Sequence, residues 1–354
     1  MPLVGKQEKQ ESPDITRPVP RTGLAPDKKE ETPKQEVRYK RLPLGTDGKL
    51  LPAGPRLQSP AQLVVVKYPK SGTTLSLCDV PKILIGDSEK GTTDFRPRNV
   101  ADLIDLSVVG KFVETNKYGW LPQTIFDIVD ELKHANNMSV YWKLKNDMET
   151  ERDLDRANDL YKQLVELINS MPFPVFAVDT VTSIVNLSNE AALYEYYKEN
   201  PNAKRRESIK RVDEWGGVSH IRRKFAEIKQ FIETNAAPFI QYHGHVAPRK
   251  KIMKKDDDDI AGVDIALDGI MAVTFTAFAN AVCTFYRDSS NKDPRQQGCF
   301  LDFTKKDETD MGSRPKHLSN QVIKIADILP HEEILKGSRP VTYWNHVYPE
   351  IDFS

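Results

Sequence analysis

The chain has 354 residues, of which 39% are hydrophobic and 29% are charged, so a sizeable core can form beneath a well-solvated surface. Lysine plus arginine and aspartate plus glutamate number 51 each, and the formal net charge of +0 excludes a global basic field that would hold nucleic acid or an anionic membrane. The three cysteines show no CxxC spacing, which argues against a disulfide scaffold and a cysteine zinc module.

The first 61 residues are predicted to form an extended, proline-rich tail. Ten of the 24 prolines fall within residues 1–61, and Tyr39 is the only aromatic residue there. A segment of this composition cannot bury enough apolar surface to offset its chain entropy, so alone it is expected to be disordered. Four leucines spaced among the prolines suit successive pockets on a protein partner, although a plain linker explains the composition equally well. These leucines are Leu44, Leu50, Leu51 and Leu57.

From residue 62 onward, short apolar runs alternate with longer stretches of helical spacing. Strands are predicted at Gln62–Lys67, 82–86, 175–178 and 238–242, with further strands at 281–286, 299–303 and 322–325. Helices are predicted at Gln123–Ala135, 150–170 and 213–235, the second of them ending before Pro172 and Pro174. This alternation predicts an α/β fold with a mostly parallel sheet that helices cover on both faces.

The turn after the first predicted strand has part of a phosphate-binding motif. In such a loop, backbone N–H groups and a lysine bind phosphates, and the consensus is G-x-x-x-x-G-K-[ST]. The letters at 67–74 are K-Y-P-K-S-G-T-T, so Gly72 and Thr74 match the second glycine and the magnesium-binding hydroxyl. Lys67 stands at the first glycine and Thr73 at the lysine. Taken alone, this is a weak motif.

Polar residues end the strands that follow, where parallel sheets build their sites. Glu89 lies just beyond the second strand, where a carboxylate can orient an attacking water. Asp179 ends the third, in the position of a Walker B acid that holds magnesium, and His245 ends the fourth, near the position of a γ-phosphate sensor. Each residue alone is equally well explained as a helix cap or turn former, but their order along the chain favours a site.

These motifs together resemble a phage-encoded family of RecA-like, AAA-annotated P-loop ATPases associated with single-strand annealing and recombination. The resemblance covers residues 62 to 329 and excludes the tail. The segments that carry it are Pro69-Lys-Ser-Gly72 with Thr-Thr-Leu75, Pro81-Lys-Ile-Leu-Ile85, Asp87-Ser-Glu-Lys-Gly91, Ala177-Val-Asp-Thr180, Trp215-Gly-Gly217, Gly244-His245 and Arg314-Pro-Lys-His-Leu318.

The resemblance implies a RecA-like P-loop core at residues 62–330, between the tail at 1–61 and a C-terminal extension at 331–354. Position by position, it implies Glu89 as the catalytic glutamate, His245 as the sensor, and Thr74 with Asp179 as magnesium ligands. It places the nucleotide on Lys70, Ser71, Gly72, Thr73 and Thr74.

The departures at Lys67 and Thr73 remove a charge that stabilises the transition state, so hydrolysis is expected to be impaired and binding of ATP and Mg²⁺ weak or absent. Lys70, or Lys67 of a neighbouring subunit, remains a candidate substitute for the missing lysine.

Two functions stay open at this point. The first is a nucleotide- and DNA-associated protein of phage recombination or replication, favoured by Glu89, Asp179 and His245. The second is a structural subunit of a virion or other phage assembly, without enzymatic activity, favoured by the lost lysine, the neutral charge and the tail. A homo-oligomer or larger assembly is expected in the host cytoplasm or the virion.

Neither DNA nor a membrane is a strong candidate partner. The basic residues at 249–251 and 254–255 are followed at once by four aspartates at 256–259, so DNA binding is expected to be weak. No apolar run approaches the length of a membrane span, and no signal peptide is recognisable, so no membrane partner is expected.

Overall fold

The computed structural model describes residues 44, 48–78, 80–88, 103–105, 111–202, 217–250, 260–267, 270–291, 293, 297–304, 311–330, 332–333, 336, 338 and 340–354. The chain divides into two compact units, Met1–Leu51 and Pro52–Ser354. In the first unit, Leu44 and Leu50 form an antiparallel bridge, and the Leu50 side chain is exposed. Among the described residues, no helix combines the length and apolar character that a membrane span requires.

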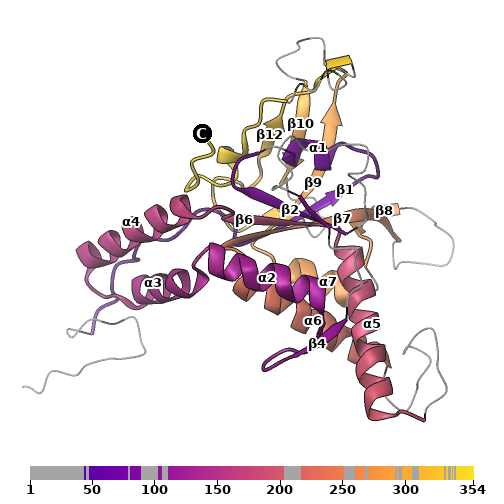
Figure 1. Ribbon diagram of the computed structural model, residues 1–354. Coiled ribbons are helices and arrows are strands. Elements are labelled where there is room, and N and C mark those ends of the chain that lie inside the picture. The colour runs from indigo at the N-terminus through magenta and orange to yellow at the C-terminus, as the bar shows by residue number, and fades with distance from the viewer. Residues whose placement is uncertain are drawn as a thin grey trace, which may run out of the picture. The chain divides into compact units, whose positions relative to one another are not determined.

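The second unit is an α/β structure built on a twisted sheet, shown in Figure 1. Within the described residues the sheet has ten strands, in the order β12-β10-β9-β1-β7-β6-β2-β3, with β11 paired to β9 and β8 to β7. The strands are β1 (Gln62–Lys67), β2 (Ile83–Asp87), β3 (Leu103–Asp105), β6 (Val175–Asp179), β7 (Phe239–Lys250), β8 (Ile260–Ile265), β9 (Ala281–Asp288), β10 (Gly298–Asp302), β11 (Gly312–Ser313) and β12 (Val322–Ala326). The six strands from β9 to β3 are parallel, and the others pair antiparallel.

Helices cover both faces of this sheet. They are α1 (Thr73–Leu77), α2 (Gln123–Ala135), α3 (Met138–Thr150), α4 (Leu154–Ser170), α5 (Val181–Glu199), α6 (Gly217–Asn235) and α7 (Ile270–Phe278). Helices α1, α3 and α4 contribute to the core on one face, while α2, α5, α6 and α7 contribute to the core on the other. Successive residues of a strand point to opposite faces, so Leu63 joins the first core and Val64 the second. Both faces are buried, which explains why β1 is a continuous apolar run.

The α/β fold with a mostly parallel sheet, expected from the alternation of strands and helices, is confirmed. The helix predicted at Gln123–Ala135 is α2, and the helix predicted at 150–170 is α4. Helix α4 begins after Asp153, whose carboxylate accepts a hydrogen bond from the Arg156 N–H at 2.9 Å. The start predicted for the helix at 213–235 falls outside the described residues, which take up that helix at Gly217.

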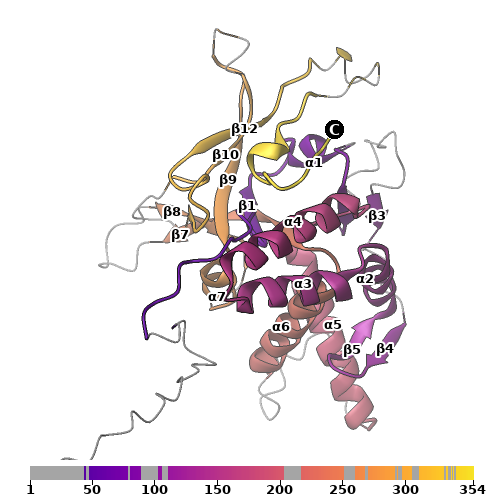
Figure 2. The ribbon, with the colours of Figure 1, turned by 90° about the vertical axis from the view of Figure 1, so that its left-hand side faces the viewer.

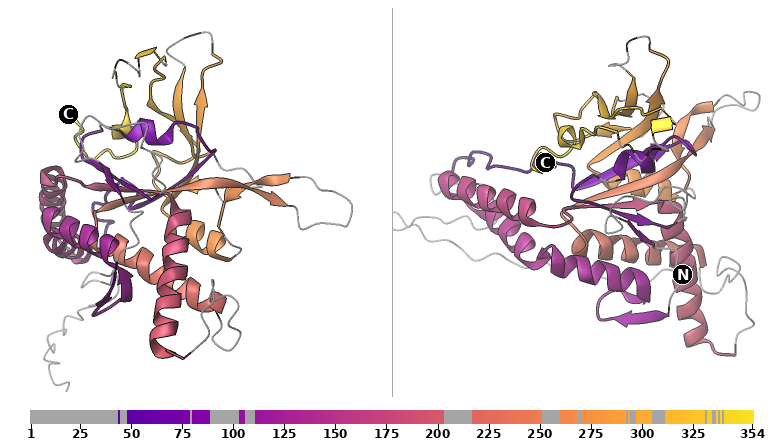
Figure 3. Two further views of the ribbon diagram at one scale, coloured as in Figure 1. Left: turned by 45° about the vertical axis from the view of Figure 1, so that its right-hand side comes forward. Right: turned by 45° about the horizontal axis from the view of Figure 1, so that its top comes forward.

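Several elements were not predicted from the sequence. They are α3, α5, α7, β3, β8, β11, and the hairpin of β4 (Phe112–Thr115) and β5 (Gly119–Pro122). The buried residues of α5 lie along one side of the helix, but that side includes Ser188, while the apolar Leu193 and Tyr197 lie off it. Helix α7 is almost wholly apolar. Neither sequence therefore shows the clear apolar stripe that marks a surface helix. Strand β7 is longer than predicted and forms an antiparallel ribbon with β8 beyond the parallel sheet (Figure 3).

The C-terminal residues complete the core beside β1 and α1. Trp344, Val347 and Tyr348 are buried, and the first of them belongs to a short 3₁₀ helix, η5 (Trp344–His346). The indole Nε1–H of Trp344 donates to the carbonyl oxygen of Ser76 in α1 at 2.9 Å. Figure 2 shows the C-terminal segment alongside α1. The segment at 331–354, expected as an extension, therefore contributes its last residues to the core.

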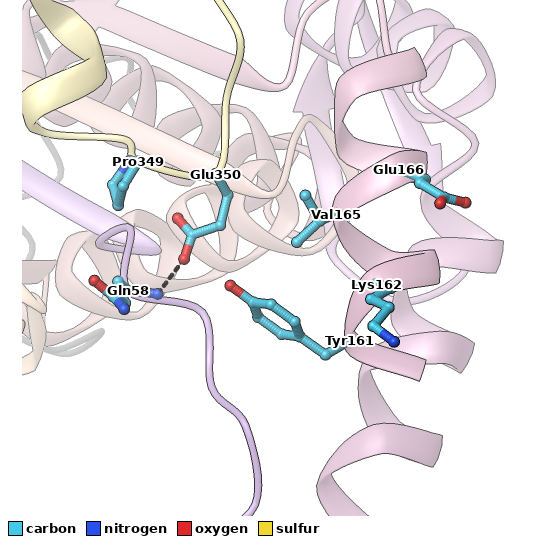
Figure 4. Close-up of a pocket in the computed structure, with 7 residues that line it drawn as sticks. All are labelled: Gln58, Tyr161, Lys162, Val165, Glu166, Pro349 and Glu350. Atoms are coloured by element: carbon cyan, nitrogen blue, oxygen red, sulfur yellow. Dashed lines mark hydrogen bonds between the residues drawn. The ribbon is translucent and has the colours of Figure 1, made fainter. Parts of the chain in front are cut away.

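The end of the segment assigned to the tail also packs in the second unit. Leu57 contacts the core, and Ser59 is buried. The Glu350 carboxylate accepts hydrogen bonds from the backbone N–H groups of Gln58, at 2.5 Å, and Ser59, at 3.0 Å, and from the Ser59 hydroxyl. Figure 4 shows Glu350 directed at Gln58 in a pocket that Tyr161 also lines. None of the predicted site residues lines this pocket.

Candidate functional site

The predicted phosphate loop at residues 67–74 and the predicted Walker B acid meet at the carboxyl edge of the parallel strands. Strand β7 lies between β1 and β6, with Asp179 opposite His243 and Lys67 opposite His245. The Lys67 side chain reaches across β7, and its Nζ lies 2.5 Å from Asp179 Oδ1. The Thr74 hydroxyl donates to Asp179 Oδ2 at 2.8 Å. The structure thus joins two predicted site residues, Thr74 and Asp179, and adds Lys67 to them.

The predicted phosphate loop turns on Gly72, which has a φ of 92°. That left-handed backbone suits glycine, and nothing lies within 4 Å of where a Cβ would be, so backbone conformation rather than space requires glycine here. Thr73 is buried, and its hydroxyl is 3.0 Å from the Ser71 hydroxyl. Lys70 is exposed in the loop, also with positive φ. The position that a phosphate-binding lysine would take is therefore filled by a small buried hydroxyl.

The Asp179 carboxylate is stabilised as an anion. Burial raises the pKa of this carboxyl, but the neighbouring ammonium of Lys67 and the hydrogen bonds from Lys67 and Thr74 lower it more. The net pKa of Asp179 lies below its ordinary value. A buried carboxylate needs a partner of opposite charge, and the Lys67 ammonium is that partner.

Ser88 holds the turn that follows Asp179. Its N–H and hydroxyl both donate to the carbonyl oxygen of Asp179, at 2.8 and 2.7 Å, and the Thr180 N–H donates to its hydroxyl oxygen at 2.8 Å. Asp87, one residue earlier, is buried at the end of β2, opposite Asp179. The predicted catalytic residue Glu89 lies outside the described residues. This turn therefore links the ends of β2 and β6 through a serine that the sequence analysis did not single out.

His243, rather than the predicted sensor His245, is the histidine directly beside Asp179. It is fully buried, and its Nε2 lies 3.1 Å from Gln241 Oε1. Burial lowers the pKa of His243 to about 3; Asp179 raises it and the Lys67 ammonium lowers it. His243 is therefore uncharged near neutral pH. His245 lies two residues further along β7, where it is half-buried and in register with Lys67.

We expect the stability of the protein to fall as the pH drops below about 6.5. The unfolded chain binds a proton at His243 that the folded chain excludes, so stability is full above the ordinary histidine pKa and is lost toward pH 3, by up to about 1.4 kcal/mol per pH unit. Asp179, whose pKa is lowered, adds to the loss at more acidic pH. Urea unfolding across this range should show a shallower acid slope for His243→Gln.

The exposed His134 provides the control for this experiment, because His134→Gln makes the same change on the surface of α2. His134→Gln should leave the pH dependence of unfolding unchanged. Parallel pH curves for the wild type and His243→Gln would show that His243 is not the group that titrates.

The site's chemistry is set by an ion pair rather than by a ready-made metal cluster. In the part of the chain that the structure describes, no group of three or more His, Cys, Asp or Glu side chains is arranged to hold a metal ion. No protein-family model matches the chain, and no curated protein is similar enough to count as a relative. The residues and geometry of the site therefore carry the functional inference.

Proposed function

We propose that this chain is a RecA-like P-loop domain that does not hydrolyse ATP and that serves as a structural subunit of a phage assembly. One observation carries the proposal: the phosphate loop offers no lysine at the phosphate-binding position. Thr73 is buried there beside the Ser71 hydroxyl, and the nearby ammonium of Lys67 is bound to Asp179.

The strand order supports a RecA-like core. Strand β7 separates the phosphate-loop strand β1 from β6, which bears Asp179, and β2 lies on the far side of β6. In a RecA-like core, the strand after the phosphate loop lies away from it in this way, and the later strands return toward it. From β1 the chain passes over two strand positions to β2 and then returns through β6 to β7, which lies beside β1. The strand order therefore reverses next to the phosphate loop. Open α/β sheets bind ligands at such a reversal.

The ion pair explains why such a core would be inactive. Phosphoryl transfer depends on positive charge placed in advance on the β- and γ-phosphates, and removing one stabilising donor typically costs about 100-fold or more in rate. Lys67 cannot supply that charge without leaving the buried Asp179 carboxylate unpaired. Lys70 is exposed on the loop and is the remaining candidate substitute.

A second candidate function, a nucleotide- and DNA-associated role in phage recombination or replication, is favoured by a separate observation. Thr74 and Asp179 are in contact, and His243 and His245 lie on the adjacent strand at the same edge of the sheet. Binding of a fluorescent ATP analogue at micromolar concentration would favour this second function.

We expect ATP turnover by the unmodified protein to be at background. Thr73→Lys should raise affinity for the fluorescent ATP analogue by about tenfold or more, because a charge-assisted hydrogen bond to phosphate is worth roughly 1.5–3 kcal/mol. Lys70→Ala tests the remaining candidate substitute and, because the proposal gives Lys70 no part in hydrolysis, should leave turnover at background. Brisk magnesium-dependent hydrolysis that Glu89→Gln abolishes would overturn the proposal, and loss of that turnover in Lys70→Ala would identify Lys70 as the substitute.

A further inference from the structure

We infer that the ammonium of Lys67 takes the place of the divalent cation at this site, so that the Thr74–Asp179 pair does not bind Mg²⁺. This inference deepens the proposed function and rests on it, since it concerns the same phosphate loop. Lys67 stands where the motif has its first glycine, and the loss of the lysine at position 73 does not explain this second departure.

The groups that would hold Mg²⁺ do not fit it in this structure. Magnesium takes six oxygen ligands in a near-octahedral shell, and a threonine hydroxyl binds it through an oxygen lone pair. Here the Thr74 hydroxyl donates its hydrogen to Asp179 Oδ2 at 2.8 Å, while Asp179 Oδ1 accepts from Lys67 Nζ at 2.5 Å. Both carboxylate oxygens are therefore already bonded, and the negative charge is already neutralised by a cation.

A divalent ion would have to share this place with a fixed positive charge. The side chains of Lys67 and Asp179 are each only 9% exposed, so water screens their charges poorly. Like charges a few ångströms apart repel strongly in such surroundings. A surface lysine could swing into solvent, but withdrawing Lys67 would leave the Asp179 carboxylate buried and unpaired.

The backbone of Lys67 is also held in place. Strand β1 pairs in parallel with β7 on one side and β9 on the other, and Lys67 is in register with His245 and Phe285. Because the lysine extends from the last residue of a central strand, its reach toward Asp179 is set by the sheet and not by a flexible loop. The ammonium is thus a built-in part of the site.

The two departures from the motif are consistent with each other. Lysine at position 67 supplies a cation beside Asp179, and threonine at 73 removes a cation that would bind phosphate. A site that does not bind magnesium-bound nucleotide does not require a lysine at position 73. Any phosphate compound that does bind this loop should therefore bind equally well with Mg²⁺ and with a chelator.

The experiment is a titration of the full chain with Mn²⁺, followed by the electron paramagnetic resonance signal of the free ion. Lys67→Gly removes the ammonium and restores the glycine of the motif. Lys70→Gly is the matched control, because it makes the same charge change at an exposed position of the same loop. Each protein is compared with its Asp179→Asn counterpart, so that weak binding elsewhere, for example at the aspartates of 256–259, is subtracted.

We expect the wild type and Lys70→Gly to show no Mn²⁺ binding that depends on Asp179. Lys67→Gly should gain one such site, at least about 100-fold tighter than any in the wild type, because the like charge is gone. If the glycine variant does not fold, Lys67→Gln takes its place, because the glutamine amide can still donate to Asp179 but carries no charge. Lys67→Gln should also gain the Mn²⁺ site.

An Asp179-dependent Mn²⁺ site in the wild type would overturn the inference, as would the absence of a new site in the folded Lys67→Gly or Lys67→Gln protein. These results are separate from the fate of the proposed function. ATP turnover that persists in a chelator would refute the proposed loss of hydrolysis while leaving Lys67 as the cation. An Asp179-dependent Mn²⁺ site without turnover would refute only the inference.

Discussion

Replacing Lys224 with alanine is expected to lower the free energy of unfolding by about 3–5 kcal/mol. Lys224 is only 1% exposed, although it carries a charge. Its Nζ lies 2.5 Å from Glu195 Oε1 and 2.7 Å from Glu227 Oε2. The substitution would remove the closest cation of Glu195, which is itself largely buried and keeps the His220 ring at 3.1 Å. Removing one partner of a buried ion pair is among the costliest changes in a fold.

This ion network joins three elements, the strand β5 and the helices α5 and α6. Glu195 is on α5, Lys224 and Glu227 are on α6, and the Trp120 N–H at the start of β5 donates to Glu195 Oε1 at 3.3 Å. Gly119 precedes it with a φ of 66°, and a Cβ there would come within 3.0 Å of Glu195 Oε1. The network therefore ties α5 to α6 and to the β4–β5 hairpin.

Urea unfolding of Lys224→Ala measures the effect, with Lys162→Ala as control. Lys162 forms an exposed ion pair with Asp159 three residues earlier on α4, and its loss should cost less than about 1 kcal/mol. The double variant Lys224→Ala with Glu195→Ala should be less destabilised than the sum of the two single variants. Equal costs for Lys224→Ala and Lys162→Ala would mean that the buried network contributes no more than a surface pair.

Trp344→Ala is expected to cost about 3–5 kcal/mol and to loosen α1 in particular. The Trp344 side chain is 1% exposed, lies against Tyr348, and donates its indole N–H to the Ser76 carbonyl oxygen of α1. Removing it opens a cavity beside a helix of only five residues, which has little stability of its own. Hydrogen exchange of the amides of α1 should therefore become faster in this variant.

Trp142 provides the matched control. It is 38% exposed on α3 and also donates its indole N–H to a carbonyl oxygen, that of Thr234, at 2.7 Å. Trp142→Ala should cost less and should leave exchange in α1 unchanged. Trp344→Phe, which keeps most of the ring but loses the donor, should fall between them. Unchanged exchange in α1 after Trp344→Ala would show that the C-terminal segment does not support α1.

Much of the fold could be predicted from sequence because it depends on neighbours along the chain. The apolar runs that became β1, β2, β6 and β7 are buried on both faces, and the period of α2 marks the side it turns to the core. Helix α5 was missed because its apolar residues do not follow its buried side: Ser188 is buried, while Leu193 and Tyr197 lie on other sides of the helix.

The amino-acid sequence by itself determined where two of the site residues stand: Thr74 shortly after the strand β1, at the start of α1, and Asp179 at the end of β6. It also showed that Lys67 and Thr73 depart from the phosphate-binding motif. Only the tertiary structure decided what Lys67 does. Lys67 and Asp179 are 112 residues apart, and they meet because β7 alone separates their strands. Strand order depends on how the whole sheet packs, and the residues flanking Lys67 carry no record of it.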